Sequence, residues 1–515
     1  MTSVARPRSA AGTAAPTRRT RPARSWAPAL GAGALAALLG AWGLGRSPLW
    51  MDETFSLGAT AQLAPTIRGT GGTMALYYVL LDGWVAVVGT SAPALRALSV
   101  VCVAACVVVT ARLARHLLTP TEGLVATAVV AAMPGLARYA QEARSYALVA
   151  LLTAGLWAAL VAAVRADGTD GPPPGSARSP WWVALAALAT LGVAAHGLFL
   201  LQLAAALGSL LALPGRARLL RAAAGAVVAP LALFAAMAVA GLDGVATWVA
   251  PLDAGQVADV GRLLLAPAAL PALVLLALAG VGAVHLLRRP GDAWTRWCAL
   301  VPVAWAVAPS VLLIALSAVR PSLVDRYVVA SVPGVALLVA VGAVATARAC
   351  GVGGGDRRRT VATVAVGVVL VGALGAGQLA VHARSGYGWD AAAATVAARA
   401  EAGDAVVFPS SPVRHPFEAA WREVPAGTPA PRPLGSSDPL GPVRRYHDRV
   451  TAEAAEADLA SQDRVWVVHR TLEGGGDAPL DDLLASPLVR STFTVADRWS
   501  SAGGVQVVLL ERRRP

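Results

Sequence analysis

The sequence contains no lysine, and only 14% of its 515 residues are charged. It has four cysteines and 5% aromatic residues, against 56% hydrophobic residues and a mean hydropathy of +0.60. So little charge in a chain of this length excludes a soluble globular protein and indicates a polytopic membrane protein. The missing lysine and the excess of Ala, Gly, Val and Arg are typical of GC-rich bacterial coding and carry no functional information.

The net charge of +13 does not indicate nucleic-acid binding, because the arginines fall in short clusters between apolar runs. Cys102, Cys106, Cys298 and Cys350 lie in or beside apolar segments without CxxC spacing, so neither a disulfide framework nor a metal cluster is expected. Core packing is the expected role of the first two. The glycines of 351–355 lack the context of a phosphate-binding loop.

Residues 1–25 are rich in Arg, Pro, Ser and Thr and contain no carboxylate, which predicts a disordered basic cytoplasmic tail. An apolar run from 27 to 45 follows. A cleavable signal peptide is the alternative for this run. The many later apolar segments favour a retained anchor.

A crossing takes about 17 to 25 apolar residues, and on this measure the chain has about eleven transmembrane helices between residues 26 and 381. The predicted crossings are 27–45, 95–115, 121–137, 145–164, 181–195, 197–213, 222–241, 263–287, 297–317, 327–347 and 361–381.

The apolar stretch 74–89 is short and has Asp82 in its middle. If it does not cross, the arginine clusters of the loops all fall on the cytoplasmic side, as the positive-inside rule requires. We therefore predict an interfacial helix in the first outer loop, with Tyr77, Tyr78 and Trp84 at headgroup depth.

After residue 381 the composition changes abruptly to that of a soluble protein, which predicts a small extracytoplasmic α/β domain over 382–515. Its hydrophobic patterns predict helices, strands and one Pro-rich surface loop. The helices are predicted at 390–402 and 480–485, the strands at 404–409, 464–469, 492–496 and 505–511, and the loop at 424–442.

The first carboxylates of the chain, Asp52 and Glu53, are adjacent and follow the first predicted span. Carboxylates this close to lipid are costly, so they either have a task or form a solvated helix end. The predicted topology places further polar residues on the same outer side, where separate loops can share one cavity. These are Gln141, Glu142, Arg144, His196, Asp243, Asp253, Asp259, Arg320, Asp325 and Arg326.

Five motifs occur in order after the first span: Trp50–Glu53, Leu76–Leu81, Ala94–Arg96, Gln141–Leu148 and Asp325–Tyr327. This order resembles the GT-C glycosyltransferases, in the branch of protein O-mannosyltransferases and lipid A aminoarabinose transferases, which use polyprenyl-phosphate sugars. Relatives commonly carry His-x-Pro-Pro before the second motif. This chain has Gly-Gly-Thr-Met-Ala there, which predicts altered specificity, with lost activity as the alternative.

The resemblance implies that Asp52 is the general base that takes the proton of an acceptor hydroxyl. Glu53 is then expected to orient the acceptor or to help hold a divalent cation, although two adjacent carboxylates are a thin basis for a metal site. Arginine binds phosphate oxygens in pairs, so Arg144 and Arg326 are candidates for the donor phosphate. The alternatives for Arg144 are an ion pair with Glu142 and a snorkelling position at the membrane surface.

The remaining substrate-binding candidates are Glu142, His196, Tyr327, Tyr77 and Tyr78. A histidine in a tight turn is more often structural than functional. The tyrosine pair is expected to anchor the interface rather than to bind ligand.

Together these features predict an inverting membrane glycosyltransferase that moves a hexose, with mannose as the first candidate, from a polyprenyl phosphate to a glycan, glycolipid or protein acceptor. A lipid or solute transporter and a non-catalytic scaffold with an outer binding domain are the alternatives. A transporter would need ionisable residues near the bilayer midplane and often a repeated architecture. The sequence shows neither, since its charges cluster at the ends of spans.

Overall fold

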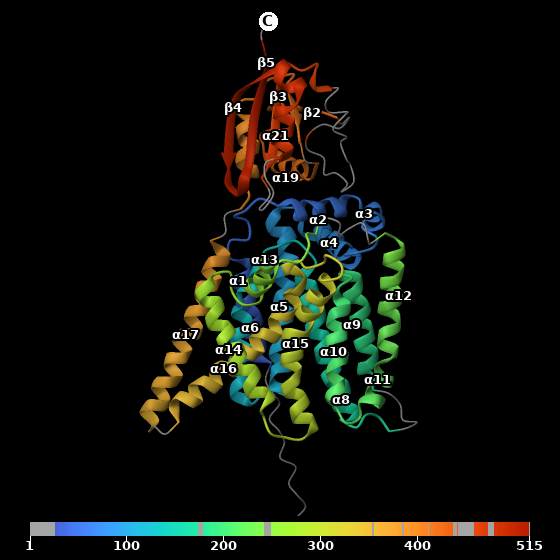
Figure 1. The fold of residues 1–515 in the computed structure, drawn as a ribbon, viewed down its shortest axis with the longest axis vertical. Coiled ribbons are helices and arrows are strands. Elements are labelled where there is room, and N and C mark those ends of the chain that lie inside the picture. The colour runs from blue at the N-terminus through green and yellow to red at the C-terminus, as the bar shows by residue number, and fades with distance from the viewer. Residues whose placement is uncertain are drawn as a thin grey trace, which may run out of the picture.

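The computed structural model describes residues 26–173, 179–241, 249–352, 355–383, 386–409, 411–435, 440, 458–471 and 478–513. They form a bundle of helices with a small α/β unit at one end (Figure 1). The predicted tail over 1–25, Asp243, and residues 436–439 and 441–442 of the predicted loop over 424–442 lie outside the described residues.

Six helices are long and apolar enough to cross a membrane, and two bent helix pairs pass the same test as single units. The chain is a multi-pass membrane protein. The six are α5 (Ala92–Leu117), α8 (Tyr146–Asp167), α14 (Ala269–Leu287), α15 (Ala293–Ser317), α16 (Val332–Gly351) with the preceding 3₁₀ turn η3 (Asp325–Ser331), and α17 (Asp356–His382). The bent pairs are α6 (Pro120–Ala132) with α7 (Pro134–Ala140), and α11 (Arg216–Ala223) with α12 (Gly225–Val239).

The three other predicted crossings are shorter apolar helices: α1 (Ala27–Ala41), α9 (Trp181–Ala195), and α10 (Phe199–Ser209) with the 3₁₀ turn η1 (Leu210–Ala212). Each predicted crossing therefore has a helix or bent pair in the structure, while the number that cross remains a prediction. One boundary was wrong. The crossing predicted at 263–287 begins only at α14, because the chain breaks after the amphipathic helix α13 (Ala254–Leu264).

The bend of 42° between α6 and α7 occurs at Pro134, the first residue of α7. Proline has no backbone N–H and fits the first turn of a helix, so it ends one helix and begins the next. The sequence predicted a single span here, over 121–137.

Helices α14 and α16 cross where two glycines meet. A Cβ on Gly282 would collide with the backbone of Leu338, and one on Gly342 with the backbone of Leu278. Small residues at a crossing let two backbones approach closely, which is how many helices pack in a bilayer. Helix α16 is accordingly the most enclosed of the candidate spans.

Three helices follow α1 at the end of the bundle that meets the α/β unit: α2 (Met51–Ala61), α3 (Leu63–Gly69) and α4 (Ala75–Val88) (Figure 1). The first two were not predicted. Helix α4 lies within the predicted interfacial helix over 74–89 and exposes apolar residues such as Val79 and Val87.

The side chains predicted to anchor α4 at headgroup depth point elsewhere. Tyr77 and Tyr78 are buried, at 1% and 3% exposure, and Trp84 is partly buried and donates a hydrogen bond to the Ala94 carbonyl at 2.9 Å. The prediction of surface anchors was therefore wrong for Tyr77 and Tyr78. Helix α4 packs on α2, α5 and α9, and its aromatic side chains fill those contacts.

The C-terminal unit holds a five-stranded mixed sheet in the order β2-β1-β3-β5-β4. Its elements are α18 (Trp389–Ala397), β1 (Ala405–Val407), α19 (Ser411–Trp421), β2 (Arg432–Pro433), β3 (Arg464–Arg470), α21 (Ala478–Ala485), α22 (Pro487–Thr492), β4 (Phe493–Ser501), η4 (Ala502–Gly504) and β5 (Val505–Arg512). Strand β1 pairs in parallel with β2 and β3, and β5 is antiparallel to both β3 and β4.

Strand β3 explains why the sheet is covered on both faces. Trp466 and Val468 pack in one core with α18 and α19, and Val465 and Val467 pack in a second core with α21 and α22. Successive strand residues point to opposite faces of the sheet. A continuous apolar run in β3 therefore supplies side chains to the cores on both faces.

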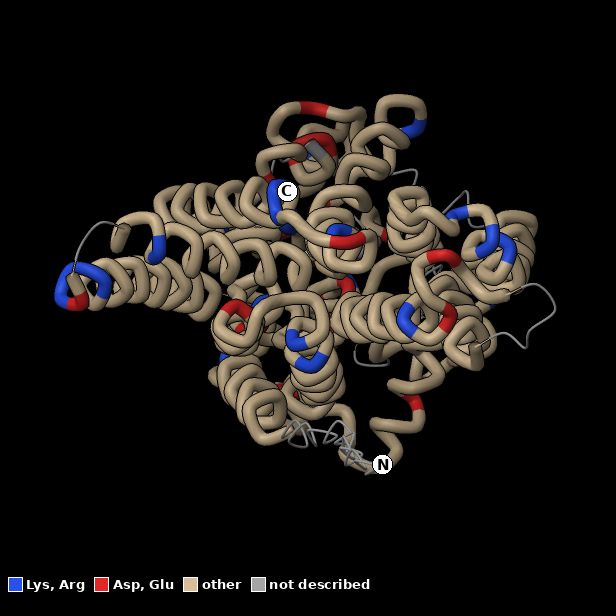
Figure 2. The backbone as a smooth tube through the Cα atoms, turned by 90° about the horizontal axis from the view of Figure 1, so that it is seen from below, with Lys and Arg blue, Asp and Glu red and all other residues tan. Residues whose placement is uncertain are grey.

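The α/β unit contacts the bundle through the chain around α2. The ring of His415 on α19 meets the ring of Phe55 edge-on at 5.0 Å, and Trp50 stacks on Tyr387 at 6.3 Å. At the opposite end, arginines lie in the connections between helices and in the adjoining helix turns, as in Arg288 and Arg289 after α14 and Arg357, Arg358 and Arg359 at the start of α17 (Figure 2, seen from below).

Candidate functional site

Asp52 and Glu53 lie in the first turn of α2. The backbone N–H of Trp50 donates to Glu53 Oε2 at 3.3 Å, and Trp50 itself is extended, so the helix begins at Met51. Carboxylates are favoured at a helix N-terminus, where backbone N–H groups lack partners within the helix. The two neighbours nevertheless point into different surroundings.

Glu53 is fully buried and paired with Arg96 of α5. Arg96 donates from Nε to Glu53 Oε1 at 2.8 Å and from Nη2 to Oε2 at 2.6 Å. The same guanidinium also donates to the carbonyls of Leu44, Ser47 and Pro48. This bidentate ion pair, with the three carbonyl contacts, holds the segment between α1 and α2 against α5.

Glu53 also fixes the loop that follows α7. Its Oε1 accepts a hydrogen bond from the backbone N–H of Ala143 at 2.9 Å, and Ser99 on α5 donates to the Glu142 carbonyl at 2.6 Å. The loop over 141–145 is thereby held against the start of α2. As a result Arg144 lies beside Asp52.

Asp52 faces two arginines that come from distant parts of the chain. Its Oδ2 lies 3.8 Å from Arg144 Nε and 3.7 Å from Arg326 Nη2, and Arg144 Nη1 donates to the Asp52 carbonyl at 3.2 Å. Asp52 Oδ2 and Arg144 Nε are buried atoms without a hydrogen-bond partner among the described residues. The three side chains are 11%, 12% and 21% exposed, so each is mostly buried but keeps some exposed surface.

A group of rings surrounds Arg326. Its Nε donates to the hydroxyl of Tyr146 at 2.9 Å, and the Tyr146 ring lies 6.4 Å from that of Tyr327. The ring of His196, in the turn between α9 and α10, lies 4.7 Å from Tyr327 and 6.1 Å from Tyr146. The structure thus brings together His196, Arg326 and Tyr327, three of the predicted substrate-binding candidates. Tyr146, the first residue of α8, was missed as a site residue.

Part of the His196 surface is exposed, but the ring lies deep among the helix ends. Burial, together with the positive charges of Arg144 and Arg326, lowers the pKa of His196 to about 4. The ring is therefore neutral at physiological pH. One of its nitrogens, Nδ1, accepts from the backbone N–H of Leu198 at 3.3 Å.

Glu142 points away from Asp52 toward Arg138, with 3.5 Å between Oε2 and Nη1. It is 2% exposed. Burial raises the pKa of Glu142, although Arg138 acts in the opposite direction. The alternative of an ion pair between Glu142 and Arg144 is thus not what the structure shows.

Several predicted outer polar residues lie apart from this cluster. Asp253 caps α13 by accepting from the Gln256 N–H, and Asp259 pairs with Arg262 on the exposed face of the same helix. Gln141 donates to the Trp42 carbonyl at 2.7 Å. The described structure therefore brings fewer of these outer polar residues together than was predicted, and the cavity that they would share stays a prediction.

The residues present do not fit a metal site. Both Glu53 oxygens are engaged by Arg96 and by the N–H groups of Trp50 and Ala143, which leaves Asp52 as the carboxylate of the cluster. In the described ranges, no three His, Cys, Asp or Glu side chains gather as ligands. The mechanism proposed below uses protein side chains alone.

The segment that replaces His-x-Pro-Pro makes a tight turn before α4. Gly71 and Gly72 have φ of 59° and 82°, and Met74 is the one non-glycine residue with positive φ in the described chain, at 63°. Glycine enters this region at no steric cost, whereas proline cannot. This turn therefore could not form in the same way with proline at position 74.

The arrangement of helices is similar to that of two membrane glycosyltransferases of known structure. ArnT from Cupriavidus metallidurans gives a TM-score of 0.55 at 14% identity, over 92% of this chain and 96% of ArnT. The oligosaccharyltransferase AglB from Archaeoglobus fulgidus gives 0.54 at 12% identity, over 93% of this chain and 74% of AglB. The chain has the GT-C fold.

At these identities the likeness concerns the GT-C fold alone. No protein-family profile and no curated protein matches the sequence. ArnT has also been solved with undecaprenyl phosphate, with a TM-score of 0.53 at 15% identity over 92% of this chain and 96% of ArnT. AglB has been solved with an inhibitory peptide and a dolichol-phosphate, with a TM-score of 0.52 at 12% identity over 93% of this chain and 74% of AglB.

Proposed function

We propose that the protein is an integral membrane glycosyltransferase that moves a sugar from a polyprenyl phosphate to an acceptor hydroxyl. The observation that carries this is the cluster at the start of α2, where Asp52 Oδ2 lies between the guanidiniums of Arg144 and Arg326. A base and two cationic phosphate ligands are what the reaction requires. The cluster is built on a fold that ArnT and AglB share.

The distribution of arginines supports an orientation. Arginines occur at the ends of α5, α8 and α16 and at the starts of α11 and α17, which lie opposite the α/β unit, and positive loops face the cytoplasm. The site and the α/β unit over 382–515 are then on the extracytoplasmic side of the cytoplasmic membrane, and the N-terminal tail is inside. The polyprenyl chain would enter sideways from the outer leaflet.

The donor phosphate is assigned to Arg144 and Arg326. Arg144 Nε is a buried donor without a hydrogen-bond partner among the described residues, so a phosphate oxygen would satisfy it. Tyr146 holds the Arg326 guanidinium by its Nε, which leaves the Nη groups on the side of Asp52. ArnT with undecaprenyl phosphate and AglB with a dolichol-phosphate are the precedents for such a lipid on this fold.

The transfer is a single displacement with inversion. Asp52 Oδ2 takes the proton of the acceptor hydroxyl as the acceptor oxygen forms its bond to the anomeric carbon. The bond from that carbon to the phosphate oxygen breaks, and the electron pair leaves with the polyprenyl phosphate. Arg144 and Arg326 stabilise the charge that develops on this phosphate. Glu53 does not take part in these steps, and its pair with Arg96 holds the start of α2, and with it Asp52, in place.

The sugar is a hexose, with mannose as the first candidate, and the acceptor is a glycan, a glycolipid or a protein hydroxyl. Neutral His196 and Tyr327 are placed to contact the sugar, because they lie beside Arg326. The changed turn at 71–74 then alters which acceptor fits. An assay with several polyprenyl-phosphate sugars and separate lipid, protein and glycan fractions tests this choice.

Replacing Arg144 by lysine should raise KM for the polyprenyl-phosphate donor about tenfold or more, with a smaller change in KM for the acceptor. Lysine keeps the charge but cannot present two parallel donors to a phosphate. The measurement is initial rate against donor concentration in purified membranes. Arg262→Lys on exposed α13 is the matched control and should change neither constant. Equal loss of affinity for both substrates in the Arg144 variant would contradict the assignment.

The pH profile of transfer should show no step from His196 between pH 5.5 and 8, because its pKa is about 4. The unfolded chain takes up this proton near pH 6.5 and the folded one only near 4, so His196 lowers stability progressively as the pH falls between these values. His196→Gln should therefore leave the shape of the rate profile unchanged. A step near pH 6.5 in the wild type that disappears in the variant would show that His196 titrates during turnover.

A further inference from the structure

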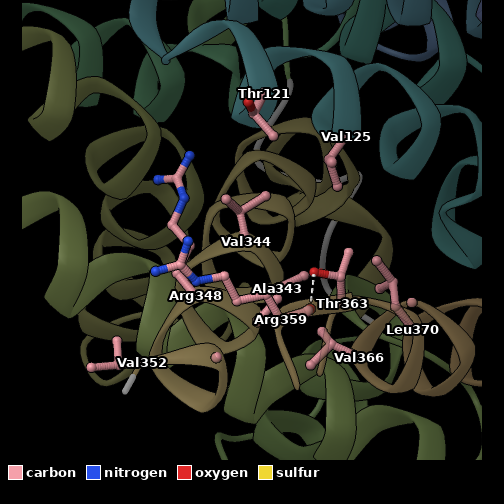
Figure 3. A pocket seen from close by; sticks show the side chains of 13 residues that line it. Thr121, Val125, Ala343, Val344, Arg348, Val352, Arg359, Thr363, Val366 and Leu370 are labelled. Atoms are coloured by element: carbon pink, nitrogen blue, oxygen red, sulfur yellow. Dashed lines mark hydrogen bonds between the residues drawn. The ribbon is translucent and has the colours of Figure 1, made fainter. Parts of the chain in front are cut away.

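A pocket with apolar walls and a cationic end lies at the end of the bundle opposite the Asp52 cluster. It has a volume of about 580 Å³, which is within the range of small-molecule sites. It is formed by α6, α16 and α17 (Figure 3). The glycosyltransferase mechanism uses none of its residues.

The walls of the pocket are mainly aliphatic. Val125 of α6, Val344 of α16, and Val366 and Leu370 of α17 line it. Neighbouring residues on α17, including Val368, are exposed apolar side chains. The pocket therefore opens where the protein surface is suited to lipid rather than to water.

The polar end of the pocket is cationic. Arg348 lies in the last turn of α16 and Arg359 in the first turn of α17, and Figure 3 shows their guanidinium groups on the same side in that view. The thirteen described lining residues include these two arginines and no carboxylate. The hydroxyl of Thr121 adds a hydrogen-bonding group, while that of Thr363 donates to the Arg359 carbonyl at 2.9 Å.

One buried carboxylate lies near this end without cancelling its charge. Glu122 Oε1 is 3.8 Å from Arg348 Nη1, but it accepts a hydrogen bond from Arg289 Nη2 at 2.7 Å and is 1% exposed. Glu122 is thus shared between Arg289 and the more distant Arg348, and Arg359 adds a second arginine to the pocket. An anionic ligand would compensate their charge.

The dimensions match one leaflet of a bilayer. From Arg359 to Leu370 the helix rises about 16 Å, which is half of a hydrocarbon core about 30 Å thick. The arginines are then at headgroup depth and the aliphatic walls at the depth of the acyl chains. Proteins commonly bind anionic lipid headgroups through basic pockets between helices on the cytoplasmic side.

We propose that this pocket is a binding site for an anionic glycerophospholipid of the inner leaflet. Its phosphate lies between Arg348 and Arg359, and one acyl chain lies along α17 between Val366 and Leu370. The lipid ties α17, which continues to the α/β unit, to the core helices α6 and α16. This site is separate from the polyprenyl-phosphate site proposed above and does not depend on it.

The test is native mass spectrometry of the full-length protein, exchanged into detergent with phosphatidylglycerol or phosphatidylcholine. Wild type should hold phosphatidylglycerol about tenfold more than phosphatidylcholine, since each arginine near the headgroup favours an anion. The double variant Arg348→Gln/Arg359→Gln should lose this preference. Arg357→Gln/Arg358→Gln is the matched control, because both residues are exposed in the same turn of α17 and neither lines the pocket.

A second pair of variants fills the groove without changing charge. A Cβ at Gly367, which lines the pocket, meets nothing within 4 Å, so Gly367→Leu should fold normally and displace the acyl chain. Gly372→Leu is the control, since its Cβ also meets open space and it does not line the pocket. Loss of bound phosphatidylglycerol in the first variant alone supports the proposal. Equal binding of both lipids by wild type, equal losses in test and control variants, or stronger retention of added undecaprenyl phosphate would overturn it.

Discussion

Asp52→Asn is expected to lower kcat for sugar transfer by a factor of about 10² to 10⁴, while binding of the polyprenyl-phosphate donor persists. Asparagine has nearly the same shape as aspartate but cannot accept the proton of the acceptor hydroxyl. Arg144 and Arg326 remain in place to hold the phosphate, and neither then shares its charge with Asp52. The measurements are single-turnover transfer rates and direct binding of undecaprenyl phosphate to the purified protein.

Asp253→Asn is the matched control, because Asp253 only caps α13 and asparagine caps a helix equally well. It should transfer at the wild-type rate. Two results would contradict the role of Asp52. One is an unchanged kcat in Asp52→Asn, and the other is a loss of donor binding as large as the loss of rate.

Arg96→Met is expected to destabilise the folded protein by about 3 to 5 kcal/mol, the cost of leaving one partner of a buried ion pair alone. Methionine fills a similar volume but leaves the Glu53 carboxylate uncompensated and three carbonyls without their donor. Thermal unfolding in detergent measures the loss. Sugar transfer should fall in parallel with the folded fraction, because Arg96 acts on Asp52 only through Glu53.

The exposed pair of Asp259 and Arg262 is the control for this experiment. Arg262→Gln should change stability by less than about 1 kcal/mol, since exposed ion pairs contribute little. The double variant Glu53→Gln/Arg96→Met should be more stable than Arg96→Met alone, because it removes the lone buried charge. If the double variant is less stable than Arg96→Met, the interpretation of this pair is wrong.

The positions of the apolar helices could be predicted from the sequence because hydropathy is a local property. The helix α17 was predicted at 361–381 and occupies Asp356–His382, and α9 was predicted at 181–195 and occupies those residues. The strands β3 and β5 were likewise close to their predicted bounds. In the helices and in these strands alike, a run of consecutive apolar side chains marks the element in the sequence.

The environment of individual side chains could not be predicted in the same way. The sequence presented Asp52 and Glu53 as a pair, yet one faces two arginines and the other is enclosed by Arg96, 43 positions away. Arg96, near the start of the apolar helix α5 and far from Arg112 and Arg115 at its other end, was the available signal, because a charge beside lipid requires a partner. Arg96 belongs to the third motif, Ala94–Arg96, but no residue near it in the sequence identifies Glu53 as its partner.

Tyr77 and Tyr78 show the same limit from another side. Aromatic residues in an amphipathic segment are typical of a membrane interface, which is why they were predicted to face headgroups. The structure turns this face of α4 inward and exposes valines instead. The direction of a helical face depends on its neighbours α2, α5 and α9, which the local pattern does not contain.

The central claim is tested most directly by transfer of labelled sugar in membranes that contain wild type or Asp52→Asn at equal levels, with membranes lacking the protein as background. Radiolabelled polyprenyl-phosphate mannose and other polyprenyl-phosphate sugars are supplied in turn, and label is followed into lipid, protein and glycan fractions. We expect wild-type membranes to transfer at least one of these sugars and the variant to lose that transfer. Label that stays at background with every donor would contradict the proposed reaction. Equal transfer by wild type and Asp52→Asn would contradict the role of Asp52.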